Sequence, residues 1–112
     1  MFYSTSRFDQ AIGTWNTATV TTMFEMFRDV SAITAMESLF AAVTNMKYMF
    51  RQASRFNQTS GTWNTAAVTN MRGMFYYASS FDQASGTWNI ASVTTMYGTL
   101  FWATSFDQAI GT

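Results

Sequence analysis

Hydrophobic and polar positions recur along this chain with a period of 25 residues. A Phe-Asx-Gln motif begins at Phe56, Phe81 and Phe106, and an earlier copy begins at Phe8. Each copy inside the chain is followed by Gly-Thr-Trp-Asn and then by Val-Thr-x-Met-x-x-Met-Phe or a close variant. A fixed period in this range is typical of repeat architectures, in which stacked units share one continuous core.

The second half of the unit predicts a short helix. Its apolar residues stand at i, i+3, i+6 and i+7 in 20–27, which is one stripe of a helix surface. Thr17 and Thr65 precede this half and are expected to cap the helix, because their oxygens can accept from free N–H groups. Gly73 and Gly98 lie inside it and weaken it.

The first half of the unit predicts a short strand followed by a bend. Phe-Asx-Gln-x-x-Gly-Thr-Trp-Asn is too short for a helix and ends in turn-forming residues. Its recurring glycine indicates unusual dihedral angles or a close approach between units. The copies of that glycine are Gly13, Gly61, Gly86 and Gly111. One strand and one helix per unit predict an α/β, leucine-rich-repeat-like right-handed solenoid.

The middle of the chain departs from the period, and two alignments describe it. Ile33 begins a copy of the second half, and Val43 begins another directly after it. We prefer the alignment in which one copy has lost its first half, because it preserves Thr and Met positions. The alternative pairs Phe8 with Ile33 and Trp15 with Phe40.

The repeats divide the chain into one domain, 1–112, with an irregular middle. Because no Gly or Pro occurs between Met23 and Ala53, we expect an irregular helical stretch around 23–53 that distorts the stack. Both ends lie inside a unit, so we expect a fragment of a longer array. The units are a partial repeat 1–7, a repeat 8–32, strand-less partial copies 33–55, full repeats 56–80 and 81–105, and a truncated repeat 106–112.

Composition narrows the function classes. Charged residues make up 11% of the chain and the net charge is +0, which argues against nucleic-acid partners. No apolar run is long enough to predict membrane insertion. The chain has no Cys and no His, so disulfides, imidazole catalysis and the usual zinc sites are excluded. We predict no enzyme activity, no cofactor and no metal site.

The full motif resembles a known family. Phe-Asn-Gln-x-x-Gly-Thr-Trp-Asn-Thr-Ala-x-Val-Thr-Asn-Met-x-x-Met-Phe-x-x-Ala-Ser is similar to the BspA-like surface-protein repeat, also known from Mycoplasma lipoproteins as a domain of unknown function. The resemblance implies a leucine-rich-repeat-type fold, an extracellular or cell-surface location, and adhesion to host proteins in some relatives. The family often has Asp after Phe-Asn-Gln, where this chain has Ala11, Thr59, Ala84 and Ala109. No role of that carboxylate carries over.

Three registers of the repeat have both a structural and a functional interpretation. The recurring Trp and Phe rings predict a stacked core rather than a sugar platform. Asp9, Asn57, Asp82 and Asp107 share a register that would suit a retaining glycosidase pair or a cation clamp. We favour a polar ladder that bonds to neighbouring backbone, because like charges so close are costly. A third register could order water as a flat threonine array, and it holds Thr14, Thr62, Thr87 and Thr112.

Positions that vary between copies are not needed for stacking, so they are the candidate contacts. These are Tyr76, Tyr77, Tyr97 and Trp102, while solvated charges are expected at Arg28, Arg51 and Arg72. Asn57 begins a glycosylation sequon. The sequence therefore predicts a surface or adhesion module that contacts proteins or glycans. The alternatives are a structural spacer and, third, a carboxylate hydrolase. End-to-end self-association is expected from unpaired edges.

Overall fold

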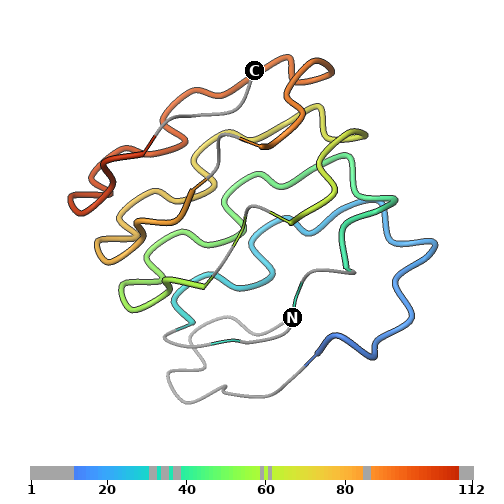
Figure 1. Cartoon of the computed structure of the whole chain (residues 1–112), viewed down its shortest axis with the longest axis horizontal. Coiled ribbons are helices and arrows are strands. Elements are labelled where there is room, and N and C mark those ends of the chain that lie inside the picture. The colour runs from blue at the N-terminus through green and yellow to red at the C-terminus, as the bar shows by residue number, and fades with distance from the viewer. Residues whose placement is uncertain are drawn as a thin grey trace.

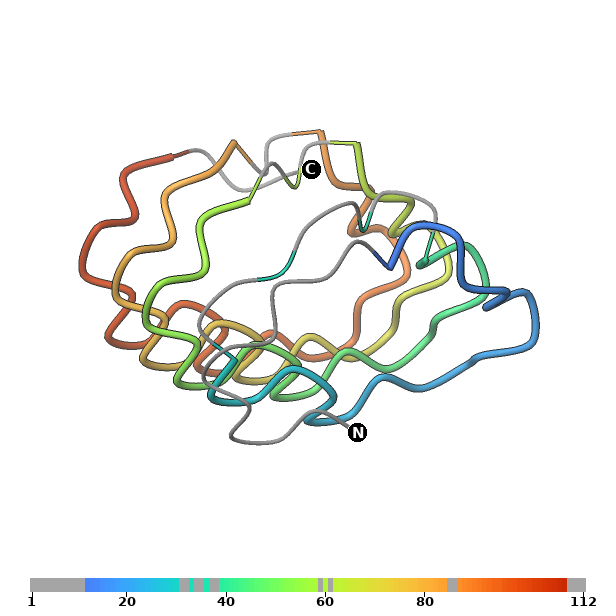
Figure 2. The same cartoon turned by 90° about the horizontal axis from the view of Figure 1, so that it is seen from below.

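Equivalent segments of successive units lie side by side and pair in parallel. The structure, a computed structural model, describes residues 12–30, 33, 36, 39–58, 60, 62–84 and 87–108. Isolated parallel bridges join Thr22 to Asn45, Asn45 to Asn70, and Asn70 to Thr95. The units therefore follow one another in chain order from blue to red (Figure 1). Viewed from below, their paths nest into one another (Figure 2).

The predicted α/β solenoid, with one short strand and one short helix in each unit, is wrong. The described part of the chain contains no helix, and its only strand-like residues are the bridge residues Thr22, Asn45, Asn70 and Thr95. The irregular helical stretch expected around 23–53 is wrong too, since the described residues there form turns and extended links. The radius of gyration of 12.5 Å is that of a compact body.

A run of overlapping turns takes the place of the predicted helix. In the first described unit the N–H groups of Met26, Arg28 and Val30 donate to the carbonyls three residues earlier. A residue with positive φ recurs every fourth position, at Glu25 and Asp29 in this unit. An α-helix cannot contain such residues, because its dihedral angles require negative φ throughout. The segment 23–30 is therefore a chain of turns.

In the turn runs that begin at Met23, Met46 and Met71, the remaining N–H groups bond to the next unit. Those of Met46, Tyr48, Phe50 and Gln52 donate to the carbonyls of Asn70, Arg72, Met74 and Tyr76 at 2.7–2.9 Å. Turn bonds and inter-unit bonds thus alternate along the backbone. Together they satisfy the backbone donors that burial would otherwise leave unpaired, which is what permits a core without helices.

Threonine hydroxyls reinforce the pairing between units. The backbone N–H of Thr69 donates to the carbonyl of Thr44 at 2.8 Å, and its hydroxyl donates to the same oxygen at 3.1 Å. Thr44 binds the carbonyl of Thr21 in the same way, and Thr94 binds that of Thr69. This explains the invariant Thr after Val in the repeat.

The irregular middle of the chain pairs with a unit on each side. Asn45 forms a bridge with Thr22 on one side and with Asn70 on the other. The rings of Phe40 and Trp63 are in contact, with centroids 4.8 Å apart, and Ile33 is fully buried. The ring contact fits the alternative alignment, which assigns Phe40 to the Trp register.

Stacked aromatic rings form the core, as the repeat predicts. Phe50 lies between Phe27 and Phe75, with centroid distances of 5.6 and 5.4 Å. Trp63 stacks on Trp88 at 5.9 Å. A third column contains Phe56, Phe81 and Phe106. Trp15 is the exception to the prediction, because 39% of its surface is exposed.

The Asn of Gly-Thr-Trp-Asn closes a local turn. Asn64 Oδ1 accepts the N–H of Ala66 at 3.2 Å, and Asn16 and Asn89 make the same bond to Ala18 and Ala91. These are Asx turns, which place a side-chain oxygen where a backbone carbonyl would lie. The predicted helix caps Thr17 and Thr65 therefore have no helix to cap. Thr65 is buried, and its hydroxyl donates to the carbonyl of Asn89.

Several sequence features lie outside the described residues. Of the recurring glycines only Gly13 is described, and it is not among the residues with positive φ, which include Gly73 and Gly98. The others that fall outside are the partial repeat 1–7, Phe8, Asp9, Ala11, Thr59, Gly61, Gly86, Ala109, Gly111 and Thr112.

Candidate functional site

Along each turn run, two residues that face the core alternate with two residues that face the outside. In the unit that begins at Met71, Met74 and Phe75 are buried, whereas Tyr76 is half-buried and Tyr77 is exposed. The pairing of units aligns these outward positions into four columns. The columns hold Phe24, Lys47, Arg72 and Tyr97; Glu25, Tyr48, Gly73 and Gly98; Arg28, Arg51, Tyr76 and Phe101; and Asp29, Gln52, Tyr77 and Trp102.

The C-terminal end of these columns is an aromatic face, made of Tyr76, Tyr77, Tyr97, Phe101 and Trp102. Tyr77 stacks on Trp102 at 5.9 Å, and Tyr76 stacks on Phe101 at 5.1 Å. Edge-on contacts join the two stacks within each unit. The exposed fractions of Tyr97, Phe101 and Trp102 are 77%, 51% and 55%. Phe101 and Trp102 are thus in contact with other rings of the face and still open to solvent, and Tyr97 is the most exposed ring.

The four contact residues predicted from the sequence all belong to this face. Tyr77, Tyr97 and Trp102 are exposed, and Tyr76 is half-buried. The sequence does not indicate Phe101 as a contact residue, because Leu100-Phe101 resembles the Met-Phe pair that ends the repeat motif at Met74-Phe75. The hydrogen bonds set a different register: Phe50 donates to the carbonyl of Met74, and Phe75 donates to that of Thr99. Thr99 therefore takes the inner Met74 position, which leaves Phe101 outside.

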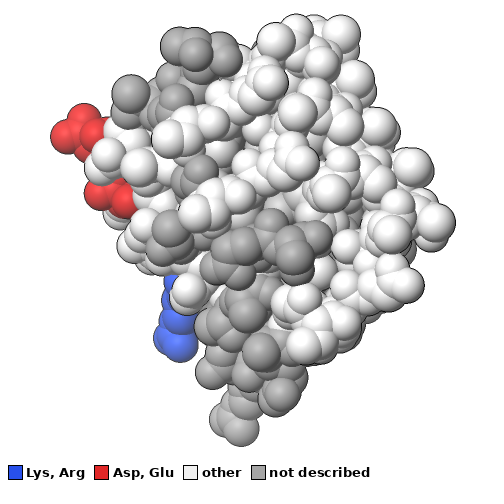
Figure 3. All heavy atoms as spheres, turned by 45° about the vertical axis from the view of Figure 1, so that its right-hand side comes forward, with Lys and Arg blue, Asp and Glu red and all other residues white. Residues whose placement is uncertain are grey.

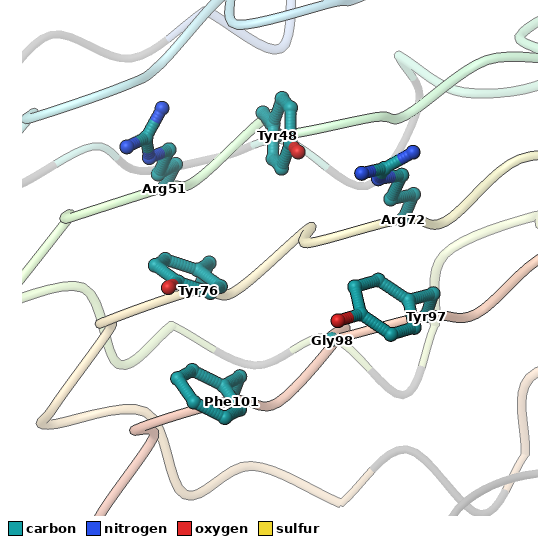
Figure 4. A pocket seen from close by; sticks show the side chains of 7 residues that line it. All are labelled: Tyr48, Arg51, Arg72, Tyr76, Tyr97, Gly98 and Phe101. Atoms are coloured by element: carbon teal, nitrogen blue, oxygen red, sulfur yellow. The ribbon is translucent and has the colours of Figure 1, made fainter.

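Arginine side chains lie against the tyrosine rings beside this face. The Arg51 guanidinium is 5.4 Å from the ring centre of Tyr48 and 5.6 Å from that of Tyr76. Arg72 lies 5.4 Å from the ring centre of Tyr97. Figure 4 shows Tyr48 between the two arginines, with Tyr76 and Tyr97 on the following units. The sequence predicted solvated arginines here: Arg72 is exposed, whereas Arg51 is half-buried against two tyrosine rings.

Charge is distributed unevenly along the outward columns. In the first unit Arg28 pairs with Glu25 at 3.2 Å and with Asp29 at 3.5 Å. The aromatic face contains no acidic residue, and the structure gives Arg51 and Arg72 no ion pair within its described part. On the face of the molecule drawn in Figure 3, the described charged residues appear only along the left margin. The positive charge beside the aromatic face is therefore a local feature of a neutral chain.

The Asx register forms the polar ladder predicted from the sequence. Asn57 Oδ1 accepts the N–H of Asp82 at 2.9 Å, and Asp82 Oδ1 accepts the N–H of Asp107 at 3.0 Å. The amide groups of Gln83 and Gln108 donate to the same two oxygens. These oxygens are already occupied by hydrogen bonds within the fold. Within the described chain, no cluster of three or more metal-ligating side chains occurs.

The other sequence-predicted polar features remain separate from the aromatic face. Thr14, Thr62 and Thr87 are exposed, and the hydrogen-bonded threonine ladder uses a different register. Asn57 is exposed at the start of the sequon. None of the described segments forms a helix of the length and hydropathy that a bilayer crossing requires.

Comparison with known proteins gives one family match. A family model described as a Mycoplasma protein of unknown function, DUF285, matches residues 1–42. The match covers the N-terminal part of the chain and stops before the full repeats 56–80 and 81–105. Neither the curated proteins nor the solved structures gave a match.

Proposed function

We propose that this chain is a non-catalytic binding module whose contact surface is the aromatic face. The observation that carries this proposal is the group of exposed, mutually contacting rings at Tyr77, Phe101 and Trp102, together with the exposed ring of Tyr97. Soluble proteins rarely leave contiguous apolar surface open unless it contacts a partner. Tyr and Trp are also the residues most enriched where binding energy concentrates.

The family resemblance supports the same proposal. The repeat motif is similar to BspA-like surface proteins, and the DUF285 match covers part of the chain. On this proposal the module acts at a cell surface or outside the cell, and it contacts host or matrix proteins or glycans. A structural spacer would need regular bonds between units but no exposed aromatic rings. The aromatic face therefore favours a binding module over a structural spacer.

The test removes two rings of the face without disturbing its backbone. Tyr77 and Trp102 have φ of 60° and 59°, a conformation that Asn tolerates better than other side chains. The double variant Tyr77→Asn, Trp102→Asn should therefore stay folded. We expect saturable binding to an immobilised panel of matrix proteins and glycans, and at least a tenfold loss of affinity in the double variant.

The matched control is Trp15→Asn, which removes an exposed ring that lies outside the aromatic face. It should bind like the wild type. Because the chain is neutral overall, binding through the rings should persist at high salt. Equal binding by all three proteins would refute the proposed surface, and absence of binding by the wild type would favour the spacer.

A further inference from the structure

A pocket lies beside the aromatic face, where arginine and tyrosine side chains of three successive units come together. Its volume is about 400 Å³, and its lining residues are Tyr48, Arg51, Arg72, Tyr76, Tyr97, Gly98 and Phe101 (Figure 4). Ligand pockets in proteins start at roughly this size, and one of roughly 300–1,000 Å³ encloses a small molecule. The pocket is therefore large enough for one or two sugar-sized rings, but not for a protein surface.

A missing side chain creates this pocket. Gly98 belongs to the column that holds Tyr48 two units earlier. A Cβ added to Gly98 would make ordinary contacts, at 3.8 Å, with Phe101 and Tyr76, so this position has room for a side-chain atom. At Gly73 the corresponding space is filled by the Tyr48 ring. This column therefore carries a ring at Tyr48 but no side chain at Gly98, which lines the pocket.

The pocket combines ring faces with two cations. Arg51 and Arg72 line it, and no acidic residue does. Each guanidinium lies against a tyrosine ring, which restrains its plane and leaves its N–H edges for a ligand. Arg72 is exposed, so its guanidinium group can be reached by a ligand from solvent. A guanidinium group pairs most strongly with an anion.

From this arrangement we infer that the pocket binds one acidic sugar unit, a pyranose ring that carries a carboxylate or a sulfate group. The exposed Arg72 guanidinium pairs with the anion through two parallel N–H bonds, and Arg51 adds positive charge on the other side of Tyr48. The sugar ring packs its C–H face against the tyrosine rings, and hydroxyl groups of both partners bond at the rim. The inference rests on the proposed binding function and names the ligand class of one part of that surface.

Calorimetric titration of the purified chain tests the inference with defined probes. These are a disaccharide that contains glucuronic acid, its carboxyl-reduced neutral analogue, a sulfated disaccharide, inorganic sulfate, and a peptide that contains sulfotyrosine. We expect the two acidic sugars to bind at least tenfold more tightly than the neutral analogue. Inorganic sulfate should bind at least tenfold more weakly than the sulfated sugar, because it offers no ring.

Two variants locate the binding in this pocket. Arg72→Gln removes one cation and should weaken the acidic sugars at least tenfold, whereas Lys47→Gln removes a cation of the same column that does not line the pocket and should have no effect. Gly98→Asn fills the open position with a residue that accepts its φ of 65° and should abolish binding without changing the net charge.

The outcomes separate this inference from the proposed function. Equal affinity for acidic and neutral sugars, or binding of the sulfotyrosine peptide alone, would overturn the acidic-sugar inference. So would equal losses in the Arg72 and Lys47 variants. In each case the panel result with Tyr77→Asn, Trp102→Asn still decides the proposed function, because neither residue lines the pocket.

Discussion

Positive φ at side-chain-bearing residues is the most unusual feature of individual positions. Among the described residues, Glu25, Asp29, Tyr48, Gln52, Tyr77 and Trp102 have φ between 51° and 61°. Each such residue costs of order 1 kcal/mol or more relative to an ordinary conformation. All six occupy the same two columns of the turn runs, which shows that the hydrogen bonding between units imposes this backbone whatever the side chain.

Gly73 and Gly98 occupy one of these columns and should respond differently to Ala. Both substitutions place a Cβ at positive φ, but at Gly73 that atom would overlap the Tyr48 ring, whereas at Gly98 it meets only ordinary contacts. We expect Gly73→Ala to lower the free energy of unfolding by about 1–3 kcal/mol more than Gly98→Ala, in line with overpacking costs. Urea unfolding measures the difference.

The control for this prediction removes the obstructing ring. In a Tyr48→Ala background, the two alanine substitutions should cost the same within about 0.5 kcal/mol, as independent sites do. A difference that persists without the Tyr48 ring would show that the backbone, rather than the ring, distinguishes the two glycines.

At the scale of the element, the turn run imitates a helix in its sequence pattern. Two inward and two outward residues alternate with a period of four, so Met71, Met74, Phe75 and Ala78 are buried at i, i+3, i+4 and i+7. A helix of about 3.6 residues per turn buries the same positions over two turns. Eight residues are too few to separate the two periods, so the pattern predicted a helix.

The register of the last unit follows from the same bonding and can be tested by a pair of substitutions. Phe75 is fully buried and stacks on Phe50 and Trp88, whereas Phe101 lies half-exposed on the outer face. Phe75→Ala should lower the free energy of unfolding by about 3–5 kcal/mol, the usual cost of removing a core ring. Phe101→Ala should cost below about 1 kcal/mol.

Chemical unfolding followed by tryptophan fluorescence measures both effects. Phe75→Leu serves as an intermediate control, since it retains most of the buried apolar volume and should cost less than Phe75→Ala. Comparable losses for Phe75→Ala and Phe101→Ala would restore the alignment that pairs these two residues.

At the scale of the whole molecule, the last described turn run has N–H groups that pair with no described unit. In the described part of the chain, the N–H groups of Met96, Gly98, Leu100 and Trp102 donate to no carbonyl. Their equivalents one unit earlier, such as Gly73 and Phe75, donate to the following unit at 3.0 and 2.8 Å. An edge of unpaired donors favours association with another chain, so we expect end-to-end self-association at high concentration.

Amide hydrogen exchange measured over a concentration series tests this association. At low concentration the amides of Gly98 and Leu100 should exchange fast, and those of Gly73 and Phe75 should be protected. Protection of Gly98 and Leu100 should rise with concentration, together with a rising sedimentation coefficient. A sedimentation coefficient that stays constant, with fast exchange at every concentration, would exclude association through this edge.

The sequence by itself determined the repeat, the stacked aromatic core, the Asx ladder and four residues of the aromatic face. Each is a property of residue identity at a fixed spacing, because units that recur must place equivalent side chains in contact. The repeat also showed that Tyr76, Tyr77, Tyr97 and Trp102 vary, and positions that vary are not constrained by the packing of the core.

Only the tertiary structure decided the local conformation and the pocket. Backbone bonds between units, not local propensity, select turns with positive φ over a helix, and no local pattern reports a bond to a residue 24 positions away. The same bonds place Phe101 outward and bring Arg51, Arg72 and Gly98 around one cavity. The cavity is lined by residues of three successive units, including Tyr48, Arg72 and Gly98. The sequence of any one unit therefore does not reveal it.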